Sequence, residues 1–441
     1  MIYKNTKEKK HLSFDALRKA FSHHLLTIPD QRQAERCDHS LHDAVMSAFA
    51  CMFFQEPSIL QFQKQMQKTN NRNNLCTLFD VETIPKDSQL RTIVDAIDSE
   101  HFRPVFKDYF EKLRNGRQLT GYKVLGQNYL CSIDGTYYHS SERIHCKKCL
   151  HKKHRNGVVS YSHGILQGAI THPNKRQVIP VMPEVIANQD GSYKKQDCEI
   201  NAAKRFIQAL KKDHPRLKLI ITGDSLFSKT PMIKTVLNAN MHYLFIAKPN
   251  DHKYMMEWVN AFDQLPSIQT TDLKQRKHRC SYVNGVPLNG QSDAQLVNYL
   301  YFEMINQNGK VVYKNSWVTD MEITDNNALQ LAKSGRCRWK IENECFNTLK
   351  NQGYYLEHNF GHGKDNLSHN LYLATLLAFF YHQIFELSDA AYQRCRQTYG
   401  SKRHLWETFR VLICFFIFED WNELLAKLMS GRGGMPFFEK V

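Results

Sequence analysis

The sequence contains no apolar run long enough to cross a membrane. Its two most apolar stretches, Leu371–Tyr381 and Val411–Phe418, fall short of the roughly 18–20 residues that a spanning helix needs. The charged start, Met1–His11, is not followed by the apolar segment of a secretory signal. The chain also has no internal repeat and no low-complexity segment. These absences argue against a membrane anchor and against export, and we expect a cytoplasmic protein.

Acidic residues are scarce relative to basic ones. The 441 residues include 43 Asp and Glu against 59 Lys and Arg, which gives a formal net charge of +16. An excess of this size favours a polyanionic partner, either nucleic acid or an anionic membrane surface. Hydrophobic residues make up 42% of the chain, which is enough to bury a core and excludes wholesale disorder.

The twelve cysteines follow no disulfide framework, and without a secretory signal they predict a reducing environment. One local group has the spacing of zinc ligands: Cys146 and Cys149 with His151 or His154. A second cysteine pair at a standard spacing is missing. Three residues from elsewhere in the chain are alternatives for closing the site in space: Cys131, Cys198 and His163. The lysines around the group favour the alternative of a loop that contacts a nucleic-acid backbone.

Two further histidines, His358 and His362, lie in the glycine-bounded segment Gly353–Gly363. Histidines in such loops are more often hydrogen-bonded to their surroundings than bound to a metal, and we expect that role for both. The zinc prediction therefore does not include them.

Apolar periodicity divides the chain into five parts. They are 1–120 (helical), 121–248 (alternating strands and helices), 249–322 (short strands), 323–365 (helical) and 366–441 (helical). Asn284-Gly285 and Asn308-Gly309 predict hairpin turns in the strand-rich part. We therefore predict an α/β core interrupted by a β-rich insertion, with a helical N-terminal domain and a helical C-terminal region. The N-terminal domain is either a DNA-binding module or a packing and oligomerisation module.

An aspartate follows each of two predicted strands. Asp134 comes directly after Tyr129–Ile133, and Asp224 follows Leu217–Thr222 and a glycine. Strand ends meet at one edge of an α/β sheet, where ligands bind, and Mg²⁺ prefers carboxylate, phosphate and water oxygens. The two aspartates are therefore candidate metal ligands, although a lone aspartate at a strand end is more often a turn residue.

A third carboxylate follows an arginine on a predicted helix. Arg338 and Glu342 are four residues apart and share one helix face beside an apolar stripe. This face can reach the strand ends, and a guanidinium group can hold phosphate. Glu344 is the competing carboxylate, but two residues further along the helix it points to another side. The alternative is a surface ion pair between Arg338 and Glu342.

Together these residues resemble the DDE triad of bacterial insertion-sequence transposases. The motifs that carry the resemblance are Asp134 after a strand, Thr222-Gly223-Asp224-Ser225 and Arg338-Trp339-Lys340-Ile341-Glu342. The similarity covers roughly Tyr129–Asn370. It implies an RNase H-like catalytic core interrupted by a β-rich insertion, with the catalytic glutamate on a helix in residues 323–365.

The resemblance implies a metal-dependent transposition reaction. Asp134, Asp224 and Glu342 would hold two Mg²⁺ ions, for which Mn²⁺ can substitute. The protein would cleave DNA at the terminal inverted repeats of a mobile element and transfer the freed strand into target DNA. It would act as a homodimer in the synaptic complex, with no membrane partner and with residues 1–120 binding the DNA ends. It would be a bacterial cytoplasmic protein, associated with the nucleoid when on DNA.

The resemblance also assigns four DNA-contacting residues: Arg338, Lys350, Trp339 and Trp317. The tryptophans would stack on a flipped base, and core packing is the alternative for each. In the family pattern a lysine falls where this sequence has Leu349 and a tyrosine where it has Gly335. Lys350 is therefore the nearest lysine, one position away.

Two other functions are alternatives. A stand-alone RNase H-like nuclease would need no insertion and no separate end-binding domain. A transposase-derived DNA-binding protein without activity would be favoured by loss of a triad carboxylate, and all three carboxylates are present.

Overall fold

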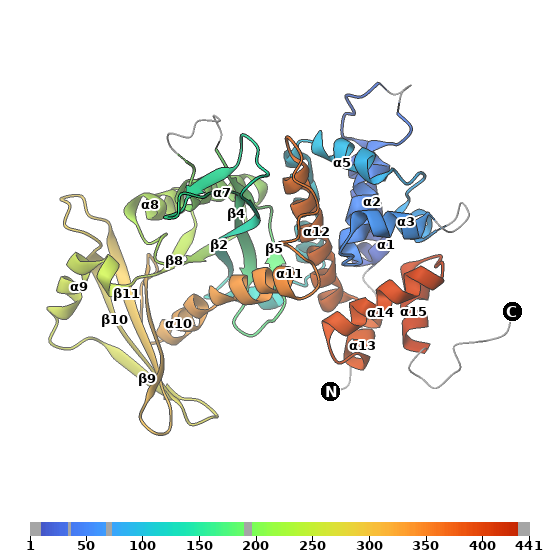
Figure 1. Cartoon of the computed structure of the whole chain (residues 1–441). Coiled ribbons are helices and arrows are strands. Elements are labelled where there is room, and N and C mark those ends of the chain that lie inside the picture. Colours follow the sequence, from blue (N-terminus) through green and yellow to red (C-terminus); the bar gives the residue numbers. More distant parts are fainter. Residues whose placement is uncertain (1–9, 34–36, 68–72, 189–195, 431–441) are drawn as a thin grey trace. The chain divides into compact units, whose positions relative to one another are not determined.

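The computed structural model describes residues 10–33, 37–67, 73–188 and 196–430 (Figure 1). The chain forms two compact units: unit 1 comprises Met1–Leu119, Tyr137–His163 and Phe346–Val441, and unit 2 comprises Thr120–Thr136 and Gly164–Cys345. These divisions differ from the predicted domains, because helices from both ends of the chain belong to one unit. Residues 1–9 and 431–441 of the predicted end regions lie outside the described residues.

Unit 1 is largely helical. Its helices are η1 (Lys10–Leu12), α1 (Phe14–Leu26), α2 (Leu41–Phe53), α3 (Ile59–Met66), α4 (Asn74–Phe79), α5 (Asp87–Asp95), η3 (Ser99–Phe102), α6 (Arg103–Asn115), α11 (Asn347–Asn351), α12 (Leu367–Ser388), α13 (Ala390–Thr398), α14 (Lys402–Phe415) and α15 (Trp421–Ser430). It also contains β3 (Leu150–Lys153). None of the described helices in the chain has both the length and the apolar character that a membrane span requires.

Helices α2 and α12 form the centre of unit 1, and each is buried along most of its length. Figure 1 shows α12 beside α2 and α5. Nδ2 of Asn370 in α12 donates hydrogen bonds to the carbonyl oxygens of Val94 and Ile97, each at 2.8 Å. The hydroxyl groups of Tyr109 and Tyr381 are 2.6 Å apart in the same interior. The N-terminal and C-terminal helices therefore complete a single hydrophobic core.

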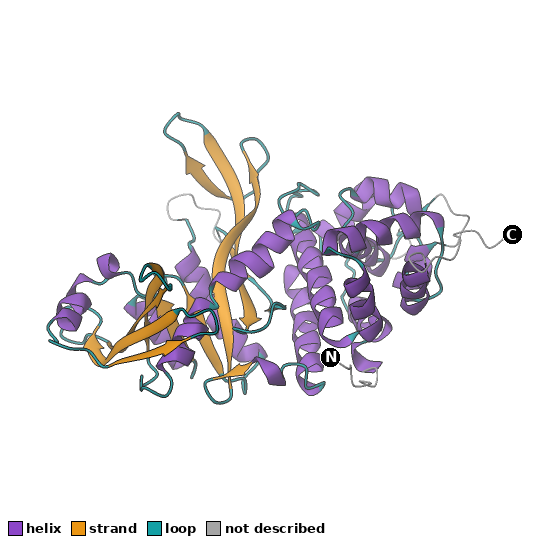
Figure 2. Cartoon of the chain, turned by 90° about the horizontal axis from the view of Figure 1, so that it is seen from below, coloured by secondary structure: helices purple, strands orange, loops and turns teal. Residues whose placement is uncertain are grey.

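Unit 2 combines a sheet with helices (Figure 2). Its strands are β1 (Lys123–Val124), β2 (Asn128–Ser141), β4 (Val159–Thr171), β5 (Ile179–Pro180), β6 (Glu184–Ile186), β7 (Leu219–Gly223), β8 (His242–Ile246), β9 (Ser267–Thr271), β10 (Lys277–Pro287), β11 (Leu296–Ile305) and β12 (Val311–Thr319), of which β2 and β4 each have one end in unit 1. Its helices are η4 (Thr120–Tyr122), α7 (Glu199–Asp213), α8 (Thr230–Asn238), η5 (Pro249–Asp251), α9 (Lys253–Asn260) and α10 (Ala328–Arg336).

The sheet of unit 2 runs in the order β4-β2-β7-β8-β12-β11-β10-β9. β2, β7 and β8 are parallel neighbours, whereas β8, β12, β11, β10 and β9 pair antiparallel in succession. The strands of the predicted insertion therefore extend the sheet of the core instead of forming a sheet of their own. This arrangement confirms a mixed α/β fold.

Three local features differ from the sequence-based expectations or refine them. β2 continues through Asp134 to Ser141, so this aspartate lies inside a strand and not at its end. Asn284-Gly285 does not form a hairpin turn: it lies within β10, where the register shifts between Val283 and Val286 and Gly285 has a φ of +75°. A glycine with positive φ suits a bulge as well as a turn. The turn predicted at Asn308-Gly309 is confirmed, and it joins β11 to β12.

Candidate functional site

The pairing of β2 with β7 brings Asp134 and Asp224 to neighbouring positions. Ser132 of β2 is in register with Thr222 of β7 in this parallel pair. Side chains two residues apart along a strand point to the same face, and each aspartate comes two residues after its register partner. The two carboxylates therefore share one face of the sheet, where the third predicted carboxylate, Glu342, is also found.

A buried ladder of hydroxyl groups supports this face. Oγ of Ser132 lies 2.8 Å from Oγ1 of Thr171 and accepts a hydrogen bond from Oγ1 of Thr222 at 2.9 Å. All three side chains are fully buried. Oγ of Ser132 is also 3.4 Å from the carbonyl oxygen of Cys337. The ladder therefore ties the strands to the segment that carries Arg338.

The segment with Arg338 and Glu342 is not one regular helix as predicted. A turn at Cys337–Arg338 follows α10, and Ile341–Phe346 forms a π-helical segment before α11. Nη1 of Arg338 lies 3.2 Å from Oδ2 of Asp134 and 2.8 Å from Oε1 of Glu342. Glu342, and not Glu344, is thus the carboxylate that forms the ion pair with Arg338. π-Helical segments are often found at functional sites.

The charges of this group act strongly on Asp134. Burial raises the pKa of Asp134 to about 7; Arg338 opposes the rise, whereas Glu342 and Asp224 add to it. A buried carboxylate whose proton affinity is raised by two neighbouring carboxylates lacks sufficient positive charge around it. A bound cation would supply that charge, and oxygen donors of this kind fit Mg²⁺.

A fourth carboxylate, Glu199, belongs to the same group and was missed by the sequence interpretation. Burial raises its pKa, and the charge of Asp224 adds to the rise. A Cβ atom added at Gly135 would come within 2.4 Å of Cδ of Glu199, so the missing side chain at Gly135 makes room for this carboxylate. In the sequence, Glu199 is indistinguishable from an ordinary acidic residue in the first turn of an amphipathic helix.

The predicted DNA-contacting residues lie in different surroundings. Trp339 is 40% exposed, and Nζ of Lys340 lies 5.6 Å from its ring centroid. Trp317 is fully buried in the core of unit 2, which is the packing role considered as its alternative. Its indole lies where a side chain at Gly335 would otherwise be. Lys350 belongs to unit 1, where its Nζ is 2.8 Å from Oε1 of Glu357.

The predicted zinc ligands need correction. In unit 1 the ligand atoms of Cys146, Cys149, His163 and His362 all lie within 4.8 Å of one another. Nε2 of His154 is instead 2.8 Å from Oγ of Ser160, and His151 is not part of the cluster.

The register of β3 and β4 accounts for the difference. Leu150 pairs with Ser162 in this antiparallel ladder, so the preceding Cys149 faces the following His163. His163 was one of the alternative ligands in the sequence. His362, expected to be a hydrogen-bonded loop residue, forms such a bond through Nδ1 to the carbonyl oxygen of Gly363. Its Nε2 also lies 3.4 Å from Sγ of Cys149, 213 positions earlier in the chain.

The chain was compared with protein families, curated proteins and solved structures. A model of the protein family described as "Transposase DDE domain" matches residues 147–380, more than half of the chain. The match includes Asp224 and Glu342 and begins after Asp134. Among solved structures, the NurA nuclease from Sulfolobus solfataricus is similar over 69% of this chain and 99% of its own, with 8% identity and a TM-score of 0.23, too low to support an argument. No curated protein matches the chain.

Proposed function

Because the chain belongs to the transposase DDE domain family, we propose that it cleaves DNA at the ends of a mobile element and transfers the freed strand into target DNA. One observation carries the assignment of the site. Arg338 places its guanidinium between the carboxylates of Asp134 and Glu342, at 3.2 and 2.8 Å, on the sheet face that Asp224 shares. A cation held by converging carboxylates is the arrangement that a metal-dependent phosphoryl-transfer site needs.

We assign the core of unit 2 to the RNase H-like type. The support is the strand order β4-β2-β7-β8 with parallel pairing of the last three strands. Asp134 lies in the inner strand β2, and Asp224 directly follows its neighbour β7. The antiparallel strands β9–β12 then come between β8 and the segment with Glu342, as expected for a β-rich insertion.

The carboxylates fit a pair of Mg²⁺ ions, for which Mn²⁺ can substitute. Asp134, Asp224 and Glu342 offer hard oxygen donors, and Arg338 stands in for part of the missing positive charge. Two bound Mg²⁺ ions would activate the attacking oxygen and stabilise the leaving oxygen of the phosphodiester. Arg338, once released by the carboxylates, would be free to donate hydrogen bonds to a phosphate oxygen. Glu199 would add a fourth negative charge near Asp224.

DNA is the proposed substrate and partner, and the net charge of +16 supports this assignment. We propose that the helices of residues 1–120 contribute to recognition of the terminal inverted repeats, and that two copies of the chain meet in the synaptic complex. The N-terminal helices share their core with α12. Recognition must therefore be tested on the full chain and not on an isolated N-terminal fragment.

The decisive experiment uses the full chain and duplexes that carry the DNA flanking its own gene. We expect Mg²⁺-dependent nicking at an inverted repeat and joining to a second duplex. Asp134→Ala, Asp224→Ala and Glu342→Ala should each remove both reactions and leave end binding unchanged. Asp293→Ala is the matched control, because Asp293 is an exposed aspartate of the same unit.

The alternatives predict other outcomes. Cleavage without preference for the repeats and without joining would identify a stand-alone nuclease. Specific binding without cleavage by the wild type would identify a DNA-binding protein derived from a transposase. Nicking that survives all three alanine substitutions would show that the carboxylates are not the catalytic site.

A further inference from the structure

Four metal-binding side chains meet in unit 1 that the proposed reaction does not use. Cys146 and Cys149 lie between β2 and β3, His163 lies in β4, and His362 lies in the loop between α11 and α12. We propose that these four residues hold one structural zinc ion. The proposal concerns unit 1 alone and does not depend on the proposed activity.

The distances between the ligand atoms match a tetrahedral zinc site. Zn–S bonds of about 2.3 Å and Zn–N bonds of about 2.0–2.1 Å at tetrahedral angles separate two sulfurs by about 3.8 Å. They separate a sulfur from a nitrogen by about 3.6 Å, and two nitrogens by about 3.3 Å.

The observed separations follow this pattern. The Sγ atoms of Cys146 and Cys149 are 3.9 Å apart. Nε2 of His163 lies 3.5 and 3.4 Å from these two atoms. Nε2 of His362 lies 3.4 Å from Sγ of Cys149 and 3.0 Å from Nε2 of His163. Five of the six donor separations thus agree with a tetrahedral zinc site, and all four donor atoms lie within 4.8 Å of one another.

A backbone hydrogen bond orients the ring of His362 for metal binding. Its Nδ1 lies 2.8 Å from the carbonyl oxygen of Gly363, which can only accept a hydrogen bond, so Nδ1 carries the proton. Its other ring nitrogen, Nε2, faces His163 and Cys149. A hydrogen bond from the second ring nitrogen to a backbone carbonyl is the usual outer support of a zinc-bound histidine.

The composition and burial of the cluster indicate a structural site. Two cysteines and two histidines form a closed ligand set with no position left for a substrate. Cys149 is fully buried, and His163 and His362 are each only 8% exposed. A disulfide does not explain the cysteine pair, because the 3.9 Å between their sulfurs is far longer than the bond of about 2.05 Å. Thiolate and imidazole donors in tetrahedral arrangement favour zinc over Mg²⁺.

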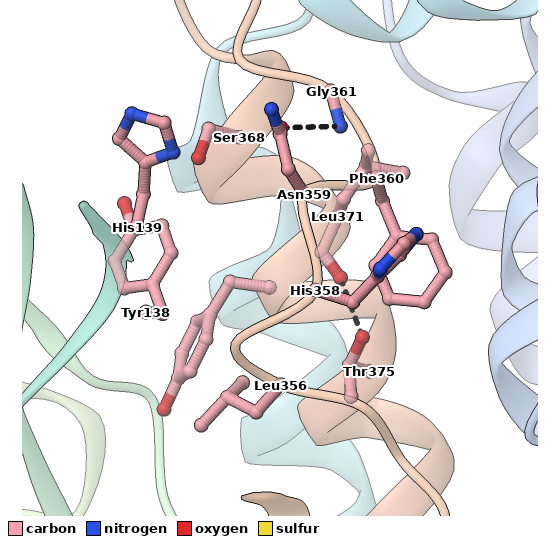
Figure 3. A pocket seen from close by; sticks show the side chains of 11 residues that line it. Tyr138, His139, Leu356, His358, Asn359, Phe360, Gly361, Ser368, Leu371 and Thr375 are labelled. Carbon is pink, nitrogen blue, oxygen red and sulfur yellow. Dashed lines mark hydrogen bonds between the residues drawn. The ribbon is translucent and has the colours of Figure 1, made fainter. Parts of the chain in front are cut away.

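Zinc at this position would fasten the loop between α11 and α12. Next to His362, the loop residues Leu356–Gly361 fold over α12 and line a small hollow with Tyr138 and His139 (Figure 3). The ring of His139 lies 4.6 Å from that of His362. Lys148, between the two cysteines, donates a hydrogen bond from Nζ to Oδ1 of Asn366 at 2.9 Å. The ion would therefore link segments that the chain brings together only after folding.

The first test is the metal content of the full chain, purified without chelator from zinc-supplemented cells. We expect about one zinc ion per chain by mass spectrometry. Replacement by Co²⁺ should give the visible absorption of a tetrahedral site and a near-ultraviolet sulfur-to-cobalt band. Both cysteine thiols should resist alkylation until a chelator is added. A chain without zinc that also fails to give the Co²⁺ spectrum overturns the proposal.

Variants identify the ligands. Cys149→Ser and His362→Ala should lower the zinc content at least tenfold, whereas His151→Ala and His154→Ala should retain it. His362→Cys keeps a zinc ligand at this position, so it should retain the metal and strengthen the sulfur-to-cobalt band, which separates loss of a ligand from failure to fold. Loss of zinc in His154→Ala with retention in His362→Ala would overturn the assignment. Nicking activity plays no part in these readouts, so a failure of the zinc proposal and a failure of the proposed function are distinguishable.

Discussion

Nη1 of Arg338 lies 2.8 Å from Oε1 of Glu342, and the same atom reaches Asp134 at 3.2 Å. This arginine supplies a positive charge between two carboxylates. The proposed Mg²⁺ ions would therefore compete with the Arg338 ion pairs for the same oxygens. Under this proposal, metal binding would release Arg338 from the carboxylates and leave it free to contact a DNA phosphate.

Substitution of Arg338 separates its two roles. In Arg338→Ala the carboxylates lose a competing cation, so Mn²⁺ should bind at least as tightly as in the wild type, as followed by electron paramagnetic resonance. End nicking should nevertheless fall by about 10²–10³-fold, the usual cost of removing one charge-stabilising donor. Arg338→Lys keeps the charge and should recover part of the rate. Weaker Mn²⁺ binding in Arg338→Ala would contradict competition.

The stability of the metal-free protein should depend on Asp134. The pKa of this group is about 7 in the folded protein against an ordinary value of 3.8. The contribution of Asp134 to the free energy of unfolding is therefore most favourable below pH 3.8 and is lost as the pH rises through 7. Asp134→Asn removes this titration, so at pH 8 in a chelator its Tm should exceed that of the wild type.

The Tm should rise by roughly 2–4 °C for each kcal/mol gained in the free energy of unfolding, as for other units of this size. Added Mg²⁺ should raise the Tm of the wild type and leave that of Asp134→Asn nearly unchanged. Asp293→Asn serves as the control at an exposed position. A lower Tm for Asp134→Asn at pH 8 would show that the carboxylate is not under electrostatic strain.

The effects of substitutions at Glu199 and Gly135 on the free energy of unfolding should not be additive. A methyl group at Gly135 would lie 2.4 Å from Cδ of Glu199, so Gly135→Ala should displace the carboxylate and destabilise the fold by about 1–3 kcal/mol. Glu199→Ala removes the obstacle, and the double variant should be more stable than the sum of the single effects predicts. Denaturant unfolding of the four proteins measures the coupling. Additive effects would mean that the two residues do not meet.

DNA binding should weaken steeply with salt. Each neutralised phosphate contributes about −0.9 to the slope of log K against log salt concentration. Lys152 and Lys153 are exposed beside the cysteine segment, and their replacement by alanine should flatten the slope by up to about 2. Lys310→Ala, at an exposed hairpin position, is the control. An unchanged slope in the double variant would remove this segment from the DNA contacts.

The sequence could predict those candidate site residues that lie in or beside a strand or helix with a clear apolar pattern. Asp134 and Asp224 could be found because each lies in or after an apolar strand, and Glu342 because it lies four residues after Arg338. Trp317 could not be placed, since a lone tryptophan carries the same signal whether it packs in a core or faces DNA. The bulge at Asn284-Gly285 was missed because a glycine with positive φ serves both a bulge and a turn.

Residues joined only by tertiary structure left no local signal. In the sequence, Glu199 resembles any acidic residue in the first turn of a helix. His362 lies 213 positions from Cys149, which it contacts. Apolar periodicity told which faces of the N-terminal helices are buried. The pattern could not show that α12 covers these faces. The predicted boundary at residue 120 therefore separates segments that share one core.

The shared core also sets the order in which the chain can fold during synthesis. Asn370 of α12 satisfies the carbonyl groups of Val94 and Ile97, so α1–α6 leave the ribosome long before their interior partner exists. Unit 2 ends at Cys345 and is complete before α12 emerges, and compact units fold as wholes. The apolar faces of α1–α6 must therefore stay exposed until α12 has been synthesised. A translation product that stops before Leu367 would carry these faces uncovered, and we expect it to aggregate or be degraded instead of competing with the full chain for DNA.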